Sequence, residues 1–275
     1  MSASAPKTPA PAGTCDTHMH IYEPGFPMAP TASIGPVPNA TLPDYLKLRE
    51  TLGIERTVIV QPSTYGTDNR CTLEAMAKLG DSARAVVTID TSISDDELAD
   101  LTAKGARGAR FFLVGGGPVG WDILDEIAHR IADHGWHIQL QIVGREFPER
   151  EAAISNLPCG LVIDHIGRFE DPIDVDHPAF QCLRRLVAGG AYMKLSAPYY
   201  ASKKGPPAYE EAGPLVRRLI EDAPERMLWA TNWPHPGETP RPDDGILMDA
   251  LMAPAGNQAT RRRILVDNPA ALYGF

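Results

Sequence analysis

Short apolar, β-branched runs alternate with longer amphipathic segments along nearly the whole chain. The short runs indicate buried strands, and apolar positions that recur once per helical turn indicate helices. The expected strands lie at residues 14–21, 56–61, 85–90, 108–113, 137–143, 161–166, 192–197 and 227–233. The expected helices lie at residues 42–52, 69–79, 95–104, 120–134, 148–155, 177–187, 208–222, 244–251 and 258–266.

Repeated strand and helix pairs are the sequence form of βα units around a parallel sheet. Eight such units predict an α/β fold, a TIM-type (β/α)8 barrel, built as a single domain from residues 14–275. A length of 275 residues suits one such barrel. A doubly wound open sheet is the alternative, but no glycine-rich phosphate-binding turn follows the first strand.

Two segments outside this pattern are rich in proline. Residues 1–13 contain Pro and Ala but no apolar run, and we expect them to form a flexible tail. Residues 23–43 carry six prolines and form a connection too long to be only a linker. We interpret this second segment as a wall of the active-site mouth.

Charge and cysteine content narrow the range of partners. The formal net charge is −9, with 26 Lys and Arg against 35 Asp and Glu, which disfavours binding to nucleic acid or to anionic membranes. The four cysteines are far apart and suggest neither a zinc knuckle nor a disulfide framework. No secretory signal or membrane span is recognisable, so we expect a cytoplasmic protein that acts on a small molecule.

Polar side chains stand at the ends of the expected strands. In barrels of this type the active site lies at the carboxyl ends of the strands, so these side chains should share one rim. They are His18 and His20, Gln61, Asp90, Arg110, Gln141, Asp164 and His165, Lys194 and Ser196, and Asn232.

His18 and His20 should point to the same face of the first strand, because side chains alternate along a strand. A pair with this spacing begins the metal site of many barrel hydrolases. The same spacing also fits two hydrogen-bonded histidines in a polar loop, so both alternatives stay open at this point.

Three segments together resemble the amidohydrolase superfamily: residues 16–20 (DTHMH), 164–168 (DHIGR) and 229–236 (WATNWPHP). Within the superfamily they are most similar to the branch that contains 2-pyrone-4,6-dicarboxylate lactonase and galactarolactone isomerase. The resemblance extends from about residue 13 to residue 273. It implies a (β/α)8 barrel, chemistry at a lactone carbonyl and a site that works without a divalent metal.

Asn232 departs from the pattern that this resemblance implies, because hydrolytic members usually carry Asp there. A carboxylate can activate water, whereas a carboxamide cannot accept a proton. With His18, His20 and His165 all neutral, the expected group contains no anionic ligand. We therefore expect no cofactor, and a divalent metal at these three histidines is the disfavoured alternative.

The remaining polar residues suit an anionic, hydroxylated substrate. Arg110 is expected to bind a substrate carboxylate, and no second arginine follows it on that strand. Gln141 and the segment 194–203 are similar to the isomerase side of the branch. The expected substrate-binding residues are Arg110, Gln61, Gln141, Lys194, Ser196, Tyr199 and Lys203.

Each of these residues also has a structural alternative. Arg110 would form a salt bridge across the barrel, Lys194 would pair with Asp164 or Asp90, and Lys203 would be a solvated charge. Gln61 and Gln141 would satisfy each other's amides. Ser196 has no base partner at a recognisable spacing, so covalent catalysis is not expected.

These residues predict a lactonase-type hydrolase that acts, without a metal, on a small sugar-acid-like or dicarboxylate lactone. The expected catalytic residues are His18, His20, His165 and Asn232, with His20 or His165 carrying the proton. Asn232 would orient water or a substrate hydroxyl, and Lys194 would help to polarise the carbonyl. A lactone isomerase that interconverts ring sizes is the alternative, and a non-catalytic barrel that binds a sugar acid is the second.

Overall fold

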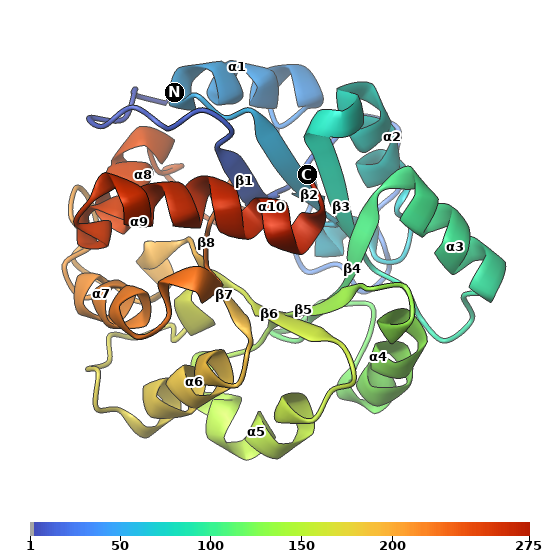
Figure 1. The fold of residues 1–275 in the computed structure, drawn as a ribbon. Helices are drawn as coiled ribbons and strands as arrows, with labels where there is room; N and C mark the ends of the chain where they lie inside the picture. The colour runs from blue at the N-terminus through green and yellow to red at the C-terminus, as the bar shows by residue number, and fades with distance from the viewer. Residues whose placement is uncertain (1–2) are drawn as a thin grey trace.

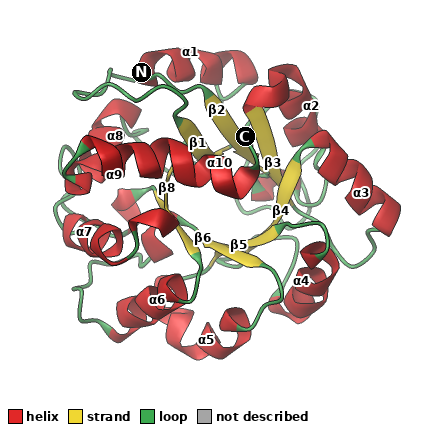
Figure 2. Ribbon diagram, in the orientation of Figure 1, coloured by secondary structure: helices red, strands yellow, loops and turns green. Residues whose placement is uncertain are grey.

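Eight parallel strands, paired in sequence order, form the centre of the computed structural model, which describes residues 3–275 (Figures 1 and 2). They are β1 (Cys15–Met19), β2 (Arg56–Val60), β3 (Ala83–Val87), β4 (Ala106–Phe112), β5 (His137–Gln141), β6 (Gly160–Ile163), β7 (Tyr192–Leu195) and β8 (Met227–Trp229). Met19 forms a parallel bridge with Trp233, and the His20 N–H donates to the Trp233 carbonyl at 2.8 Å. These contacts close the ring and confirm the (β/α)8 barrel.

Helices surround the sheet on its outer side (Figure 2). They are α1 (Leu42–Leu52), α2 (Arg70–Leu79), α3 (Asp95–Lys104), α4 (Leu124–Ala132), α5 (Phe147–Ser155), α6 (Pro178–Ala188), α7 (Gly213–Asp222), α8 (Asp244–Met252), α9 (Gln258–Arg262) and α10 (Asn268–Tyr273). Every strand and helix expected from the sequence is present with the expected type. Among the helices of residues 3–275, we find none with the length and apolar character needed to cross a membrane.

Several expected boundaries are wrong, by up to five residues at the start of α7 (Gly213 rather than residue 208), and three of the differences have a clear local reason. The last strand ends at Trp229 rather than at residue 233, because the chain leaves the extended conformation and reaches a φ of 63° at Asn232. The expected helix at 120–134 begins with a 3-10 turn over Trp121–Ile123. The expected helix at 258–266 continues through a π-helical turn, Arg263–Asp267, into α10.

The amino-terminal end of the barrel is closed by α10, which crosses in front of the strands in Figure 1. Tyr273 of α10 is fully buried in a small apolar cluster inside the barrel, which also contains Cys15, Val58, Val60, Val86, Val162 and Leu228. Arg84 donates to the carbonyls of Tyr273 and Gly274 at 3.2 and 2.6 Å. A second, larger core lies between the sheet and the helices. A ligand can therefore enter only from the opposite end.

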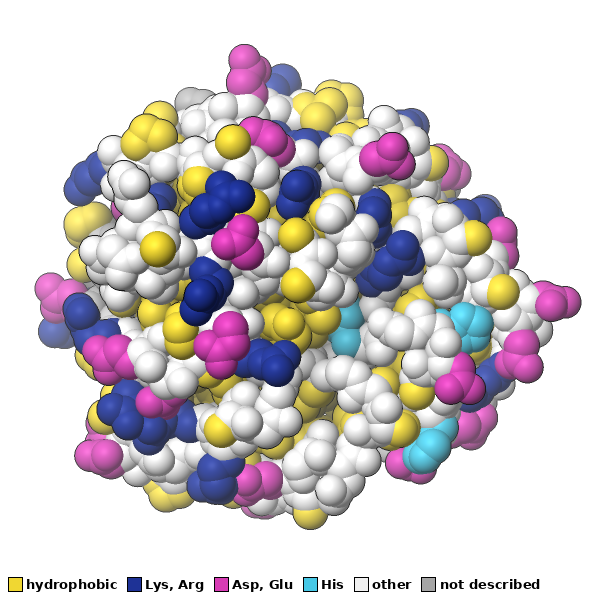
Figure 3. Space-filling model, viewed as in Figure 1, with side chains coloured by type: hydrophobic (Ala, Val, Ile, Leu, Met, Phe, Trp, Pro, Cys, Tyr) yellow, Lys and Arg dark blue, Asp and Glu magenta, His cyan; other side chains and the backbone are white. Residues whose placement is uncertain are grey.

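The segment before β1 makes specific contacts where the structure describes it. The Ser4 backbone N–H and hydroxyl donate to the Asp243 carboxylate, and the Lys7 N–H donates to Asp249 of α8. These contacts place the described part of the segment beside α8, while the expected flexibility of residues 1–13 stays a prediction and residues 1–2 lie outside the described residues. In the face that Figure 3 shows, basic and acidic side chains are interspersed.

Candidate active site

A cavity of about 260 Å³ lies at the carboxyl ends of the strands. Its volume suits a small molecule. Ile34 on its wall belongs to the proline-rich segment 23–43, so that segment forms part of the mouth as the sequence predicts. The lining residues are His20, Tyr22, Ile34, Pro62, Ser63, Thr64, Arg110, Phe112, Gln141, His165, Arg168, Tyr200, Asn232, Pro236, Gly237 and Glu238.

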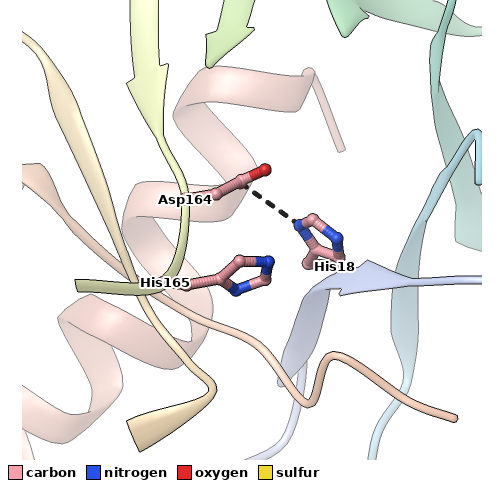
Figure 4. Close-up of side chains that lie close together, drawn as sticks. All are labelled: His18, Asp164 and His165. Atoms are coloured by element: carbon pink, nitrogen blue, oxygen red, sulfur yellow. Dashed lines mark hydrogen bonds and ion pairs between the residues drawn. The ribbon is translucent and has the colours of Figure 1, made fainter. Parts of the chain in front are cut away.

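Four buried polar side chains form a network beneath this cavity: His18, Gln139, Asp164 and Lys194. His18 Nδ1 lies 3.2 Å from Asp164 Oδ1 (Figure 4), and Gln139 Nε2 donates to Asp164 Oδ2 at 3.1 Å. Lys194 Nζ lies 2.6 Å from Gln139 Oε1, 3.4 Å from His18 Nδ1 and 3.6 Å from Asp164 Oδ1. The ammonium thus donates to Gln139, lies close to His18 and forms an ion pair with Asp164. Lys194 pairs with Asp164 rather than reaching the cavity.

The hydrogen-bond partners of the first two histidines fix the position of the proton on His20 and leave two positions for the proton on His18. His20 Nδ1 is 2.8 Å from the Val60 carbonyl, which can only accept, so His20 Nδ1 carries a proton. The Nε2 atom of neutral His20 is then an acceptor, 3.2 Å from His18 Nε2. The proton of a neutral His18 lies either on Nε2, toward His20, or on Nδ1, toward the Asp164 carboxylate, and Lys194 and Gln139 can donate to Nδ1 only when it is bare. His20 lines the cavity, but its Nε2 lies against His18 Nε2.

Burial sets the protonation of these groups. It lowers the pKa of His20 to about 3, with Arg110 acting in the same direction, and lowers the pKa of His18 well below its usual value. Burial also lowers the pKa of Lys194 to about 8, although the nearby Asp164 opposes the shift. At pH 7 the histidines are therefore neutral and Lys194 is mainly cationic.

A left-handed turn after β6 brings His165 and Arg168 to the cavity. The φ angles of His165, Ile166, Gly167 and Arg168 are 57°, 55°, 80° and 47°. Each non-glycine residue in this region costs about 1 kcal/mol, and such strain is concentrated at functional sites. Figure 4 shows the His165 ring beside His18 and Asp164.

His165 has the most adaptable proton of the three histidines. Its Nδ1 is 2.8 Å from Ser196 Oγ, and a hydroxyl can either donate or accept. The His165 Nε2 atom has no hydrogen-bond partner within residues 3–275, so it can be a bare acceptor or a donor toward the cavity. Burial lowers the pKa of this imidazole well below its usual value.

Arg110 of β4 lies on the cavity wall and is held from two sides. Its Nη1 donates to the Gln61 carbonyl at 2.5 Å, and its Nη2 donates to Gln141 Oε1 at 3.1 Å. Its Nε has no partner in the described part of the chain, and the guanidinium lies 5.0 Å from the Phe112 ring centroid. No salt bridge across the barrel holds Arg110 among the described residues, so its charge is available to an anionic ligand.

Arg168 provides a second cation that the sequence reasoning missed. Its guanidinium lies 4.7 Å from the centroid of the Tyr200 ring and donates to Glu170 at 2.7 Å. The Arg168 Nε is buried without a partner in the part of the chain that the structure describes. Because Arg168 follows β6 through a left-handed turn, strand periodicity alone gives no sign that it lines the same cavity as Arg110.

Asn232 lies on the cavity wall with three supporting side chains behind it. Asn232 Nδ2 is 2.8 Å from the Tyr199 hydroxyl, which is 3.1 Å from His235 Nδ1. His235 Nε2 is 3.0 Å from Asp244 Oδ1. The backbone N–H of Asn232 donates to the His18 carbonyl at 2.9 Å, which fixes its position relative to β1.

The structure brings together only part of the residue set expected from the sequence. The cavity is lined by His20, His165, Asn232, Arg110 and Gln141, while His18, Lys194 and Ser196 lie buried beneath it.

Three expected binding residues lie elsewhere. The Gln61 side chain binds the carbonyls of Gly66 and Asp68 and not Gln141, Tyr199 lies behind Asn232, and Lys203 pairs with Asp171 at the surface.

Several residues of the cavity and of the hydrogen-bond networks around it were not singled out from the sequence. Gln139 stands two residues before Gln141 on β5 and shares its face, so strand alternation was a usable signal. Tyr22, Tyr200, Glu238 and His235 lie on loops after the strands, where no periodicity applies. Ser196 does have a histidine partner, His165, but it comes from the turn after β6 rather than from a nearby position in sequence.

The donor atoms of His18, Asp164 and His165 lie within 4.8 Å of one another, which is a spacing that could hold a metal ion. The Lys194 ammonium lies 3.6 Å from Asp164 Oδ1 and 3.4 Å from His18 Nδ1, so it already neutralises the carboxylate. The cluster contains one carboxylate, Asp164, in place of the expected His20, so the expectation of a group without an anionic ligand was wrong. This donor set fits a divalent cation poorly.

A barrel with polar side chains converging at its carboxyl end defines a TIM-barrel enzyme. Residues 15–275 match the family model described as amidohydrolase. The chain is 37% identical to a 2-pyrone-4,6-dicarboxylate hydrolase from Comamonas testosteroni, covering 98% of this chain and 93% of the relative. It is 35% identical to D-galactarolactone isomerase from Agrobacterium fabrum, covering 99% and 95%.

A ligand-free crystal structure from Agrobacterium tumefaciens superimposes with a TM-score of 0.93 at 34% identity, covering 100% of this chain and 98% of that one. The chain therefore belongs to the amidohydrolase family, which confirms the resemblance seen in the sequence.

Proposed function

We propose that the protein is a lactonase-type hydrolase that opens the ring of a small anionic lactone. The observation that supports this most directly is that Arg110 and Arg168 line one cavity of about 260 Å³ together with His165. Two cations suit a carboxylate-bearing substrate, and the imidazole suits proton transfer at an ester carbonyl. The lactone hydrolase and the lactone isomerase among the relatives support the same chemistry.

In the proposed reaction, the arginines bind the substrate carboxylate and orient the ring. His165 Nε2 accepts a proton as the oxygen of water attacks the carbonyl carbon, and returns it to the ring oxygen when the C–O bond breaks. The product is an open hydroxy acid. Lys194, His18 and Gln139 support the site from below, which replaces the expected direct contact of Lys194 with the carbonyl.

A lactone isomerase is the second candidate, and Asn232 is the observation that favours it. The carboxamide cannot remove a proton from water, but it can hold a substrate hydroxyl close to the carbonyl. Attack by a hydroxyl already bound in place requires a weaker base than attack by free water. In that case the ring size changes and no acid is released.

We also propose that this reaction needs no metal, because the Lys194 ammonium already pairs with the carboxylate of the candidate ligand group. Prolonged treatment with a chelator should leave kcat/KM within twofold of the untreated value. Loss of activity that Zn²⁺ or Mn²⁺ restores would refute the metal-free mechanism.

To test the reaction, the protein is mixed with aldarolactones or pyrone dicarboxylates. NMR then follows the ring forms of the substrate, and a pH measurement follows the release of protons. Ring opening with release of one proton supports the hydrolase, whereas a second ring form without proton release identifies the isomerase.

His165→Asn should lower kcat/KM by about 10³-fold or more, since it removes the proton carrier. His129→Asn, at an exposed position on α4, is the matched control. Unchanged turnover in His165→Asn would exclude the assigned role.

A further inference from the structure

A chain of hydrogen bonds runs from the cavity wall to the start of α8. It joins Asn232 Nδ2 to the Tyr199 hydroxyl (2.8 Å), the hydroxyl to His235 Nδ1 (3.1 Å), and His235 Nε2 to Asp244 Oδ1 (3.0 Å). His235 and Asp244 are 1% and 4% exposed, so water does not replace these contacts. Only Asn232 among the four lines the cavity.

When His235 carries a single proton, the direction of every proton in this chain follows from its far end. A carboxylate only accepts, so His235 Nε2 carries a proton toward Asp244. The Nδ1 atom of a neutral imidazole is then bare and accepts the single proton of the Tyr199 hydroxyl. Burial raises the pKa of that phenol well above its usual value, which keeps the proton in place. The Tyr199 oxygen can therefore only accept from Asn232.

This requirement fixes the orientation of the Asn232 carboxamide. Its NH2 group must face Tyr199, and its Oδ1 must point the other way. No residue within the described range donates to Asn232 Oδ1, and Asn232 lies on the cavity wall. We propose that Tyr199, His235 and Asp244 are positioning residues that hold Asn232 Oδ1 toward the ligand as a hydrogen-bond acceptor.

The consequence is a specificity for hydroxyl groups, and it rests on the proposed lactone chemistry. An oriented carbonyl oxygen binds a ligand group that donates, such as a hydroxyl, and repels a carboxylate or carbonyl oxygen. With Arg110 and Arg168 binding the anionic end, this acceptor selects a lactone that carries both a carboxylate and a free hydroxyl. A site that binds a hydroxyl in this way discriminates strongly against the analogue that lacks it.

The first test measures the protonation of His235 directly and needs no substrate. Long-range ¹H–¹⁵N correlation of the histidine-labelled full-length protein at pH 7.5, with His235→Gln used for assignment, separates the two tautomers. The expected result is a neutral His235 with its proton on Nε2. A proton on Nδ1, or on both nitrogens, would require Tyr199 to donate to Asn232, and the proposal would then be wrong.

The second test compares two lactone acids that differ only by one hydroxyl. The wild type should prefer the hydroxylated lactone, and Tyr199→Phe should reduce that preference in kcat/KM by about tenfold, because the carboxamide is no longer oriented. Tyr192→Phe is the matched control, since Tyr192 begins β7 at the other end of the barrel and stacks on Arg226.

An unchanged preference in Tyr199→Phe would overturn the positioning role. Failure of the wild type to convert any lactone would instead contradict the proposed function, while the tautomer measurement would still decide the arrangement of the chain of hydrogen bonds.

Discussion

Arg168 is a cation of the candidate active site that differs from those expected from the sequence. The sequence suggests Arg110, Lys194 and Lys203 as the cations of one rim, in a chain of net charge −9. In the structure, Lys194 is paired with Asp164 and Lys203 with Asp171, and Arg168 takes their place beside Arg110. An acidic protein thus places two arginines at one small cavity, where they can bind an anion despite the negative net charge of the whole molecule.

Replacing Arg168 by Gln should therefore weaken substrate binding more than turnover. We expect KM for an anionic lactone to rise about tenfold or more, because a charge-assisted contact is lost, while kcat falls less. Steady-state kinetics against a neutral lactone ester should show little change in KM. Arg262→Gln, on α9 at the opposite end of the barrel, is the control. Equal effects on the charged and neutral substrates would exclude an anion-binding role.

Cavity residues on the strands or just after them were mostly predictable, and residues further along the loops were not. Strand alternation together with the rule for barrel active sites correctly placed His20, Arg110 and Gln141 on the cavity wall. Of two neighbouring tyrosines, however, Tyr199 supports Asn232 from behind while Tyr200 lines the cavity. That choice depends on the short 3-10 turn after β7, which leaves no periodic signal in the sequence.

At the scale of elements, the junction between β1 and β8 depends on one buried carboxylate. Asp16 of β1 accepts hydrogen bonds from the Thr231 N–H and hydroxyl at 3.0 and 2.7 Å, and from the Tyr45 hydroxyl of α1 at 3.0 Å. Because β8 is only three residues long, these contacts supply much of the closure that strand pairing does not. They also fix the start of the loop that carries Asn232.

Asp16→Asn should accordingly destabilise the barrel, because an amide offers one acceptor oxygen where the carboxylate offers two. We expect the free energy of unfolding to fall by about 2 kcal/mol, which urea denaturation can measure. Asp125→Asn, at an exposed position on α4, should change it by less than about 0.5 kcal/mol. A difference of similar size for both variants would contradict the assigned role of Asp16.

The strands and helices themselves were predictable because each βα unit buries its own apolar face. The buried positions therefore recur along the sequence with the period of a strand or a helix. The ends of these elements were less predictable near the candidate active site. The sequence of β8 reads as a strand to residue 233, yet the left-handed residues Asn232 and His235 turn the chain inward. Such local conformations are held by tertiary contacts, here to His18 and Asp244, which the local sequence does not contain.

At the scale of the whole molecule, stability and chemistry lie at opposite ends of the barrel. Tyr273 and His137 fill the closed amino-terminal end, with ring centroids 5.4 Å apart, and the cavity occupies the carboxyl end. Gly108 is required beside His137, since a Cβ there would lie 2.6 Å from the imidazole Nε2. Changes at the closed end should therefore alter the stability of the fold with little effect on KM.

Buried histidines at both ends should make the protein sensitive to acid. Burial lowers the pKa of His137 to about 3 from an ordinary 6.5, and it also lowers the pKa values of His18, His20 and His165. Below pH 6.5 the unfolded chain takes up protons that the folded protein does not, so stability falls as the pH falls. Asp16 opposes this in part, because burial raises the pKa of its carboxyl to about 6.

His137→Gln isolates one of these contributions without touching the cavity. At pH 4.5 the wild-type His137 should cost about 3 kcal/mol relative to pH 7.5, because two pH units separate 4.5 from the ordinary histidine pKa. Urea unfolding across this range should therefore show a pH dependence that is weaker by about one proton in the variant. The exposed His129→Gln should retain the wild-type slope. An unchanged slope in His137→Gln would mean that His137 is already protonated in the folded barrel.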